Sequence, residues 1–189
     1  LPAPVMDYLE GGSDEEVALR SNTEAYRSWR IQPRSLVDVS TVDLRADLLG
    51  RTMPMPMLLC PTGYSRMFHP LGERAVAAAA NQAALPYVVS TVATTPVEEI
   101  AGMMTPAPWL QLYLLKDRSL SWDMLDRAWA SGVRVLEFSV DTAVAGRRTR
   151  DLRHGLTIPP SLGAKALAGI AARPRYWTSM LQAPALEFA

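Results

Sequence analysis

The stretch VRVLEFSVDTAVAGRR, from Val133 to Arg148, decides the expected fold and the expected site. It begins as an apolar run, Val133 to Val140, that predicts a buried strand, and Asp141 and the paired arginines Arg147 and Arg148 follow. Ligands of parallel α/β proteins bind at the carboxyl ends of the strands. An arginine fork can grip a carboxylate or phosphate through two parallel hydrogen bonds. Two interpretations remain open from these residues alone: a ligand site, or a solvated basic loop in which Asp141 accepts turn hydrogen bonds.

Upstream of this stretch, short apolar runs alternate with helical segments. Such alternation predicts an α/β fold of β/α units with a parallel sheet, and runs that are apolar on both faces suit a sheet covered on both sides. The runs are residues 57–60, 87–90, 109–115 and 133–140, and the helices are expected at 72–85, 95–104 and 119–130. A complete (β/α)8 barrel takes about 250 residues. A chain of 189 residues with four such units therefore predicts half a barrel or a small open sheet.

The flanking segments carry weaker local signals. Ser13 or Asp14 is expected to cap a helix that runs to about Trp29. A pair of short strands is expected within residues 42–49, closing at Gly50, and Thr95 to Glu98 has the form of a capping box. Short helices are expected around residues 162–172 and 176–181.

Composition excludes several classes of protein. Nineteen Lys and Arg residues balance 19 Asp and Glu residues, which argues against a general nucleic-acid binder. No run of 18 apolar residues is present, so no transmembrane segment is predicted, and residues 1–12 lack the pattern of a signal peptide. Cys60 is the only cysteine, which rules out an intrachain disulfide and a cysteine-based zinc site. We expect no metal site, a core position for Cys60 and a cytoplasmic protein.

Polar side chains come at or just after the ends of the expected strands. Gln111 and Tyr113 alternate with leucines, so they share one face of their strand. A buried glutamine needs partners for its amide and its carbonyl oxygen. A planar heteroaromatic ligand or the neighbouring protein groups would both satisfy it. The other polar residues at strand ends are Thr62, Ser90, Ser139 and Asp141.

The remaining candidates have simpler explanations. Either histidine, His69 or His154, is a possible base, but a structural or solvated role accounts for each. The arginines within residues 147–153 suggest a nucleic-acid patch, which Asp151 and the neutral net charge weaken.

A series of motifs nevertheless occurs in one order along the chain. It consists of DYLEGG (7–12), LRSNTEAY (19–26), RSLVDVS (34–40), CPTG (60–63), HPLGE (69–73), STVATTPVEEIA (90–101), WLQLYLLKDR (109–118) and SVDTAVAGRRTRDLR (139–153). Together the motifs closely resemble the FMN-dependent 2-hydroxy-acid oxidases and dehydrogenases, the family of glycolate oxidase, lactate oxidase and mandelate dehydrogenase. The resemblance extends over the whole chain, with residues 173–189 similar to the long loop that follows strand four in the family.

The resemblance implies a (β/α)8 barrel that carries FMN over the carboxyl ends of its strands. Residues 1–56 would form an N-terminal helix and lead-in, residues 57–160 the first four β/α units, and residues 161–189 the long loop. The backbone of Pro61, Thr62 and Gly63 would lie along the flavin. Ser90 and Gln111 would hydrogen-bond the flavin ring, and Ser139 would take the place of a family threonine that does the same.

The resemblance also implies the substrate contacts. Tyr8 and Arg148 would hold the substrate carboxylate, Tyr113 would contact its hydroxyl group, and Asp141 would orient the catalytic histidine as an acid behind a histidine does. In the family that histidine comes from a later strand, and its motif does not occur in this sequence. We therefore expect the C-terminal half of the same barrel as a partner, in an enzyme that forms a homo-oligomer, a tetramer.

Three residues suggest an aromatic substrate. Gly63 resembles the mandelate enzymes, Val92 stands where short-chain members often carry tryptophan, and Tyr64 differs close to the site. The expected reaction oxidises an L- or S-configured 2-hydroxy acid, mandelate or 4-hydroxymandelate, to the 2-oxo acid, with transfer of the α-hydrogen to flavin N5. The alternatives are an aliphatic acid, lactate or glycolate, and a half barrel that binds without catalysis.

Overall fold

The computed structural model describes residues 1–141, 144, 146–154, 167, 169, 171–181 and 183. The chain divides into two compact units. The first unit joins Leu1–Val42 to Val144–Gln182, and the second joins Asp43–Ala143 to Ala183–Ala189.

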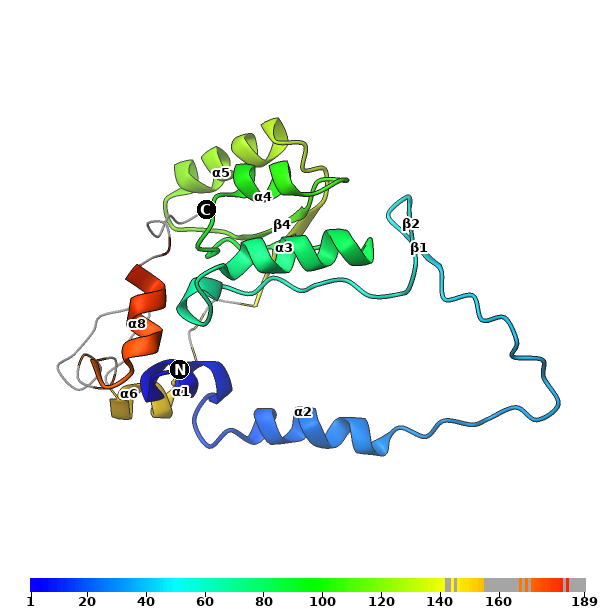
Figure 1. The fold of residues 1–189 in the computed structure, drawn as a ribbon, viewed down its shortest axis with the longest axis horizontal. Helices are drawn as coiled ribbons and strands as arrows, with labels where there is room; N and C mark the ends of the chain where they lie inside the picture. Colours follow the sequence, from blue (N-terminus) through cyan, green and yellow to red (C-terminus); the bar gives the residue numbers. More distant parts are fainter. Residues whose placement is uncertain are drawn as a thin grey trace. The chain divides into compact units, whose positions relative to one another are not determined.

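The second unit contains the expected parallel sheet. Strand β4 (Trp109–Tyr113) lies between β3 (Val88–Val89) and β5 (Leu136–Ser139), and both neighbours run parallel to it. Helices α3 (Gly72–Ala83), α4 (Val97–Met103) and α5 (Arg118–Ala130) alternate with these strands along the chain, and Figure 1 shows them gathered about β4. The predicted β/α alternation is confirmed.

Alternation along β4 directs apolar and polar side chains to opposite faces. Leu110 and Leu112 pack with Val97, Met124 and Ala128 of α4 and α5 in a buried apolar cluster. A second cluster joins α3 and α4 to β3, and its buried members are Ala77, Ala80, Tyr87, Val89, Ala93, Ile100 and Met104. The helices therefore cover one face of the sheet and leave Gln111 on the other face.

Helix α5 ends at Ala130, as expected, but it begins at Arg118, one residue before the expected start at residue 119. The Asp117 side chain accepts a hydrogen bond from the Ser119 backbone N–H at 2.9 Å and so caps the first turn. Gly132 follows the helix with φ +92°, a conformation that glycine adopts without steric penalty.

Three expectations about strands are wrong. The run from Val133 is not a buried strand: β5 is an edge strand of the described sheet, and Leu136 and Phe138 are each 47% exposed. The run that begins at Met57 contributes only a parallel bridge between Leu59 and Tyr87. Cys60 is exposed, because alternation turns it away from the helix-covered face, against which Leu59 packs.

The expected capping box at the start of α4 is also wrong. Pro96 occupies the cap position, and no side chain caps the helix. The Thr95 hydroxyl instead donates to Glu73 Oε2 at 2.9 Å, so its hydrogen bond joins two parts of the unit.

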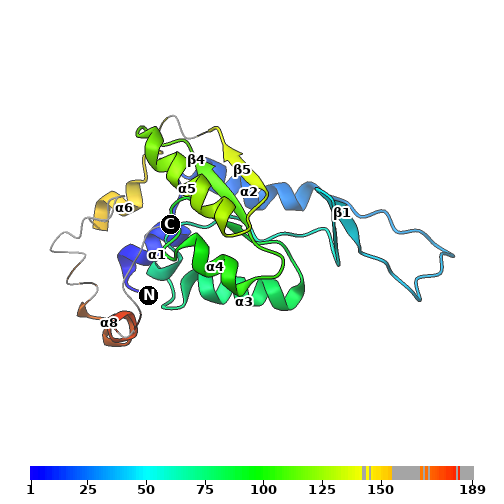
Figure 2. The ribbon, with the colours of Figure 1, turned by 90° about the horizontal axis from the view of Figure 1, so that it is seen from above.

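The expected strand pair is an antiparallel hairpin in the second unit. Strand β1 (Ala46–Leu48) pairs with β2 (Arg51–Met53), as Figure 2 shows in part. Leu49 and Gly50 both have positive φ and form the turn between the two strands. The strand pair is therefore present, but it spans residues 46–53 and does not lie within residues 42–49, because Gly50 turns the chain in the middle of the pair and does not end it.

The first unit is helical in its described part. It contains α1 (Ala3–Glu10), α2 (Val17–Ser28), α6 (Thr149–His154) and α8 (Pro174–Leu181), and α1 packs against α6. Helix α1 was not expected, and the cap of α2 is Glu16, in a left-handed conformation, not Ser13 or Asp14. Helix α8 confirms the helix expected at residues 176–181, whereas most of residues 162–172 lie outside the described part.

No helix among the described residues has both the length and the apolar character to span a bilayer.

Candidate functional site

A row of hydrogen-bonded side chains crosses the carboxyl end of the sheet in the second unit. Gln111 of β4 is 2% exposed and lies between Ser90, which follows β3, and Ser139, the last residue of β5. Gln111 Nε2 donates to Ser139 Oγ at 2.9 Å, and Ser90 Oγ donates to Gln111 Oε1 at 3.4 Å. Three of the predicted cofactor-binding residues are thus brought together on one face.

The orientation of the Gln111 amide follows from its neighbours. The Thr91 backbone N–H lies 3.1 Å from Oε1, and because this group can only donate, the oxygen must face Thr91 and the NH2 group must face Ser139. The second amide hydrogen of Gln111 and the hydroxyl hydrogen of Ser139 have no acceptor in the described part of the chain. Two donors remain for a ligand, and a flavin ring edge, with its carbonyl oxygens and ring nitrogens, fits them.

Thr91 is a site-forming residue that the sequence did not single out. Its hydroxyl donates to the Gln111 carbonyl oxygen at 2.7 Å and accepts from the Tyr113 backbone N–H at 2.8 Å. These bonds continue the β3–β4 pairing beyond the last residue of β3, so they fix Ser90 against β4.

Glu73 anchors the same loop from the first turn of α3. Its carboxylate is fully buried and accepts hydrogen bonds from the Thr94 backbone N–H at 2.9 Å and from the Thr94 and Thr95 hydroxyl groups. Both threonines are buried as well. Thr94 Oγ1 also accepts from the Arg66 backbone N–H at 3.1 Å. A buried carboxylate needs such donors to offset its lost hydration. The only sequence signal for it was an acid in the first turn of an alanine-rich helix.

The segment from Pro61 to Gly63 lies against the loop that follows β3. The Tyr64 backbone N–H donates to the Val92 carbonyl oxygen at 3.0 Å, and Ser65 Oγ donates to the Thr62 carbonyl oxygen at 3.2 Å. A Cβ on Gly63 would overlap the Val92 side chain, so a glycine is needed for this close approach. Burial raises the pKa of the Tyr64 phenol, which therefore stays protonated at neutral pH.

The two predicted catalytic residues lie at the same end of the sheet. Tyr113 closes β4 and is partly buried, and Asp141 follows β5 and is exposed. Their roles stay predictions.

The first unit brings Tyr8 and Arg148 together. The Arg148 guanidinium carbon lies 4.7 Å from the centroid of the Tyr8 ring, and Nη2 donates to the Tyr8 carbonyl oxygen. Arg148 Nε pairs with Asp151 Oδ2 at 2.6 Å. The two predicted carboxylate-binding residues are therefore neighbours, although they are far apart in the sequence.

The residues that were expected to cap α2 serve a different contact. The Asp14 backbone N–H donates to the Arg147 carbonyl oxygen at 2.8 Å, and Arg150 pairs with Glu16 at 2.6 Å. The pKa of the Glu16 carboxyl lies below its ordinary value, first because the Gly12 backbone N–H donates to it and then because of Arg150. Since Arg148 and Arg150 are both paired with acids, they do not form a free basic patch.

Other candidates lie away from these residues. His69 is exposed, and its Nδ1 accepts from the Leu71 backbone N–H at 3.2 Å, whereas the His154 side chain lies outside the described part. Within the described ranges, no group of three His, Cys, Asp or Glu residues could hold a metal ion.

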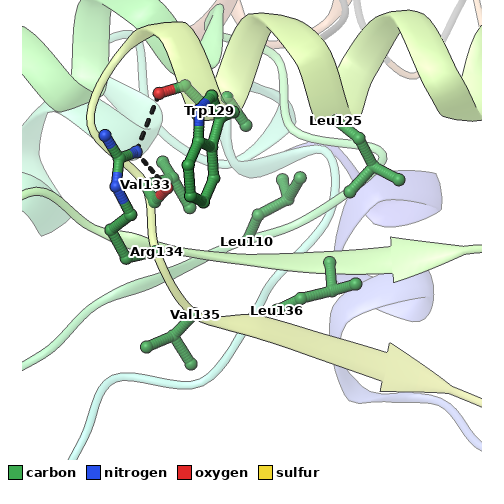
Figure 3. A pocket seen from close by; sticks show the side chains of 8 residues that line it. Leu110, Leu125, Trp129, Val133, Arg134, Val135 and Leu136 are labelled. Atoms are coloured by element: carbon green, nitrogen blue, oxygen red, sulfur yellow. Dashed lines mark hydrogen bonds between the residues drawn. The ribbon is translucent and has the colours of Figure 1, made fainter.

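Figure 3 shows an apolar pocket of about 160 Å³ between α5 and strands β4 and β5. It is lined by Leu110, Leu125, Ala128, Trp129 and Val133–Leu136. Arg134 stacks over Trp129 at 3.9 Å and donates to the Trp129 and Val133 carbonyl oxygens, so its charge is already satisfied by the end of α5. The pocket contains none of the predicted site residues.

Comparison with known sequences gives a consistent result. A family model described as FMN-dependent dehydrogenase matches residues 1–188. A 4-hydroxymandelate oxidase of Amycolatopsis orientalis is 40% identical over 176 residues, which are 93% of this chain and 49% of that enzyme. The chain thus spans about half the length of the curated relatives it matches.

Comparison with solved structures extends this to the fold. The crystal structure of the monotopic membrane protein (S)-mandelate dehydrogenase matches with a TM-score of 0.90 at 35% identity, covering 100% of this chain and 50% of that one. A mandelate oxidase mutant with the C4a-OH-FMN adduct matches with a TM-score of 0.79 at 36% identity, covering 93% and 55%. These are (β/α)8 barrels, so the prediction of a partial barrel is confirmed.

Proposed function

Because this chain belongs to the FMN-dependent dehydrogenase family, we propose that it forms part of an enzyme that oxidises a 2-hydroxy acid to the 2-oxo acid. FMN is the cofactor of the family, and when bound it takes up the α-hydrogen and the two electrons that the substrate loses. The observation that carries the proposal is the row Ser90, Gln111 and Ser139 at the carboxyl end of the sheet. In this row one Gln111 amide hydrogen and the Ser139 hydroxyl hydrogen have no acceptor among the described residues.

Different residues of this chain contact the flavin and the substrate. Ser90, Gln111 and Ser139 hold the flavin ring, and the backbone of Pro61 to Gly63 lies along it. Tyr113 contacts the substrate hydroxyl group. These roles follow from the family resemblance, and the shared face of Gln111, Ser139 and Ser90 supports them.

The carboxylate of the substrate would be held by the first unit. Arg148 supplies the positive charge, and Tyr8 supports the guanidinium with its ring. Asp141 would orient the histidine that takes the hydroxyl proton, and that histidine would come from the remaining part of the barrel, the predicted partner of this chain.

The substrate that we propose is aromatic, mandelate or 4-hydroxymandelate. Gly63 and Val92 are in direct contact, so the two residues that suggested an aryl group form one wall. Neither residue is large, which leaves more room beside that wall than an alanine and a tryptophan would leave. The matched 4-hydroxymandelate oxidase supports the same class of acid.

Flavin bleaching tests the reaction and its substrate together. The complete FMN-loaded enzyme is mixed with (S)-mandelate or glycolate without oxygen, and the flavin absorption band is followed. We expect (S)-mandelate to bleach it much faster. Faster bleaching by glycolate or lactate would replace the aromatic substrate by an aliphatic one, and an enzyme without bound flavin would leave the non-catalytic half barrel.

Assembly and location are part of the same proposal. We expect a homotetramer, which light scattering on the purified enzyme measures. A cytoplasmic location stays a prediction, and because the matched (S)-mandelate dehydrogenase is described as a monotopic membrane protein, cell fractionation is the measurement that decides it.

A further inference from the structure

We propose that Asp151 is a positioning residue, which holds the Arg148 guanidinium in the orientation that receives the carboxylate of the substrate. This inference rests on the proposed function, since it concerns how the same enzyme recognises its 2-hydroxy acid. Asp151 acts through Arg148 without contacting the substrate itself.

The Asp151 carboxylate is committed to Arg148. The residue is 5% exposed, and its Oδ2 lies 2.6 Å from Arg148 Nε. Its other oxygen, Oδ1, is buried and has no hydrogen-bond partner in the described part of the chain. A buried carboxylate needs hydrogen-bond donors or a charged partner to offset its lost hydration. Among the described residues Arg148 is the cation paired with it, so this contact is not an incidental surface pair.

The other sides of the guanidinium are also occupied, with one exception. Nη2 donates to the Tyr8 carbonyl oxygen, and the Tyr8 ring lies against the guanidinium at 4.7 Å. Nη1 has no hydrogen bond to any described residue. Arginine has many rotamers, and contacts at Nε, at Nη2 and at one face leave it few. The fixed fork therefore presents its Nη1 end to an incoming anion.

A second ion pair in the same unit provides a matched comparison. Glu16 and Arg150 lie 2.6 Å apart and also join the N-terminal segment to α6, but Glu16 does not contact Arg148. If Asp151 only stabilised α6, removal of either acid would have the same consequences. If Asp151 positions Arg148, only its removal changes the recognition of the substrate.

Charge and orientation make opposite predictions for Asp151. Removal of a negative charge beside Arg148 would by itself strengthen the attraction of an anion and lower KM. Loss of orientation raises KM, because ordering the guanidinium when the substrate binds then costs part of the binding free energy. The direction of the change in KM therefore separates the two effects.

The test uses the complete FMN-loaded enzyme with three variants, Asp151→Ala, Asp151→Asn and Glu16→Gln. Steady-state kinetics with (S)-mandelate give KM and kcat, and perturbation of the flavin spectrum by benzoylformate gives a dissociation constant that does not depend on turnover. Thermal unfolding followed by circular dichroism reports stability. The asparagine variant keeps an oxygen that accepts from Nε, so it serves as the conservative replacement.

We expect Asp151→Ala to raise both KM and the benzoylformate dissociation constant roughly tenfold or more, with a smaller change in kcat. Asp151→Asn should lie between this variant and the wild type, and Glu16→Gln should lower the unfolding temperature with KM unchanged. Equal KM values for the alanine and Glu16→Gln variants, or a lower KM in both Asp151 variants, would overturn the positioning role. A wild-type enzyme that no 2-hydroxy acid reduces would overturn the proposed function instead.

Discussion

The residues assigned to the cofactor and those assigned to the substrate carboxylate are held in different ways. Gln111 and its serine neighbours stand on a parallel ladder, and a buried network around Glu73 and Thr94 fixes the adjoining loop. Tyr8 and Arg148 come from segments far apart in sequence and are joined by a cation–π contact and a hydrogen bond from the Arg148 guanidinium to the Tyr8 carbonyl oxygen. Arg148 also forms an ion pair with Asp151.

The difference teaches how each group responds to change. Ladder hydrogen bonds are made by the backbone, so they persist when one side chain is replaced. A partly exposed ion pair depends on both side chains, on pH and on salt. We therefore expect substitutions around the cofactor residues to act by lowering the stability of the fold. Substitutions around Tyr8 and Arg148 should act by changing the orientation of the side chains that bind the substrate.

The largest expected effect is at Glu73. Glu73→Ala leaves the donors of Thr94 and Thr95 buried without an acceptor, and we expect a loss of about 3 kcal/mol in the free energy of unfolding. Glu99→Ala is the matched control, because Glu99 pairs with Arg74 at the surface and its loss should cost about 0.5 kcal/mol. Urea denaturation measures both. Equal losses of unfolding free energy in the two variants would show that the buried network around Glu73 does not stabilise the second unit.

The Gly63–Val92 contact is next in size. Gly63→Ala overpacks this contact and should destabilise the protein by about 2 kcal/mol. Val92→Ala in the same chain should recover about 1 kcal/mol, because the overlapping methyl group is gone. A double-mutant cycle of unfolding free energies measures the coupling. Additive effects of the two substitutions would mean that the residues do not constrain one another.

A substitution of Gln111 tests the proposed flavin contact without removing the backbone hydrogen bonds between the strands. Gln111→Met is close in size but removes the amide, and we expect the FMN dissociation constant to rise about fivefold, since a net hydrogen bond is worth about 1 kcal/mol. Ser131→Ala is the control, because that hydroxyl only donates to the Arg127 carbonyl oxygen at the end of α5. Fluorescence titration of the apoenzyme with FMN gives both constants. An unchanged constant for the methionine variant would remove Gln111 from the flavin site.

The smallest expected effect is at a surface ion pair on the helix layer. The Arg127 side chain lowers the pKa of Glu98 below its ordinary value of 4.5. A lowered carboxyl pKa contributes stability above the unfolded value and loses it as the pH falls through the folded value. Glu98→Gln should thus cost about 0.5 kcal/mol at pH 7, because the pair is partly exposed. The difference should shrink below pH 4.5 in denaturation curves. A difference that grows in acid would contradict the assigned pair.

The sequence predicted those parts of the fold that depend on local periodicity. The alternation in β4 placed Gln111 opposite the leucines, and the helix expected to end at residue 130 does end there. Helix α1 was missed although Pro4 and Gly11 suit a helix start and stop.

Long-range partners explain the remaining errors. Thr95 does not cap α4 because its hydroxyl donates to Glu73, and Glu16 takes the cap position of α2 because it also binds Arg150. Cys60 and Phe138 have apolar neighbours in sequence, but their exposure depends on their place at an edge or on a face of the sheet. Asp151 was missed for the same reason, since an acid among arginines looks like a solvated residue until its burial is known.

The most direct test of the central claim is a crystal structure of the complete enzyme with FMN bound. We predict that polar atoms of the flavin ring edge lie within about 3 Å of Gln111 Nε2 and of Ser139 Oγ, with the Gln111 oxygen still facing Thr91. A flavin bound elsewhere, with the Ser90–Gln111–Ser139 row left as it is here, would contradict the account.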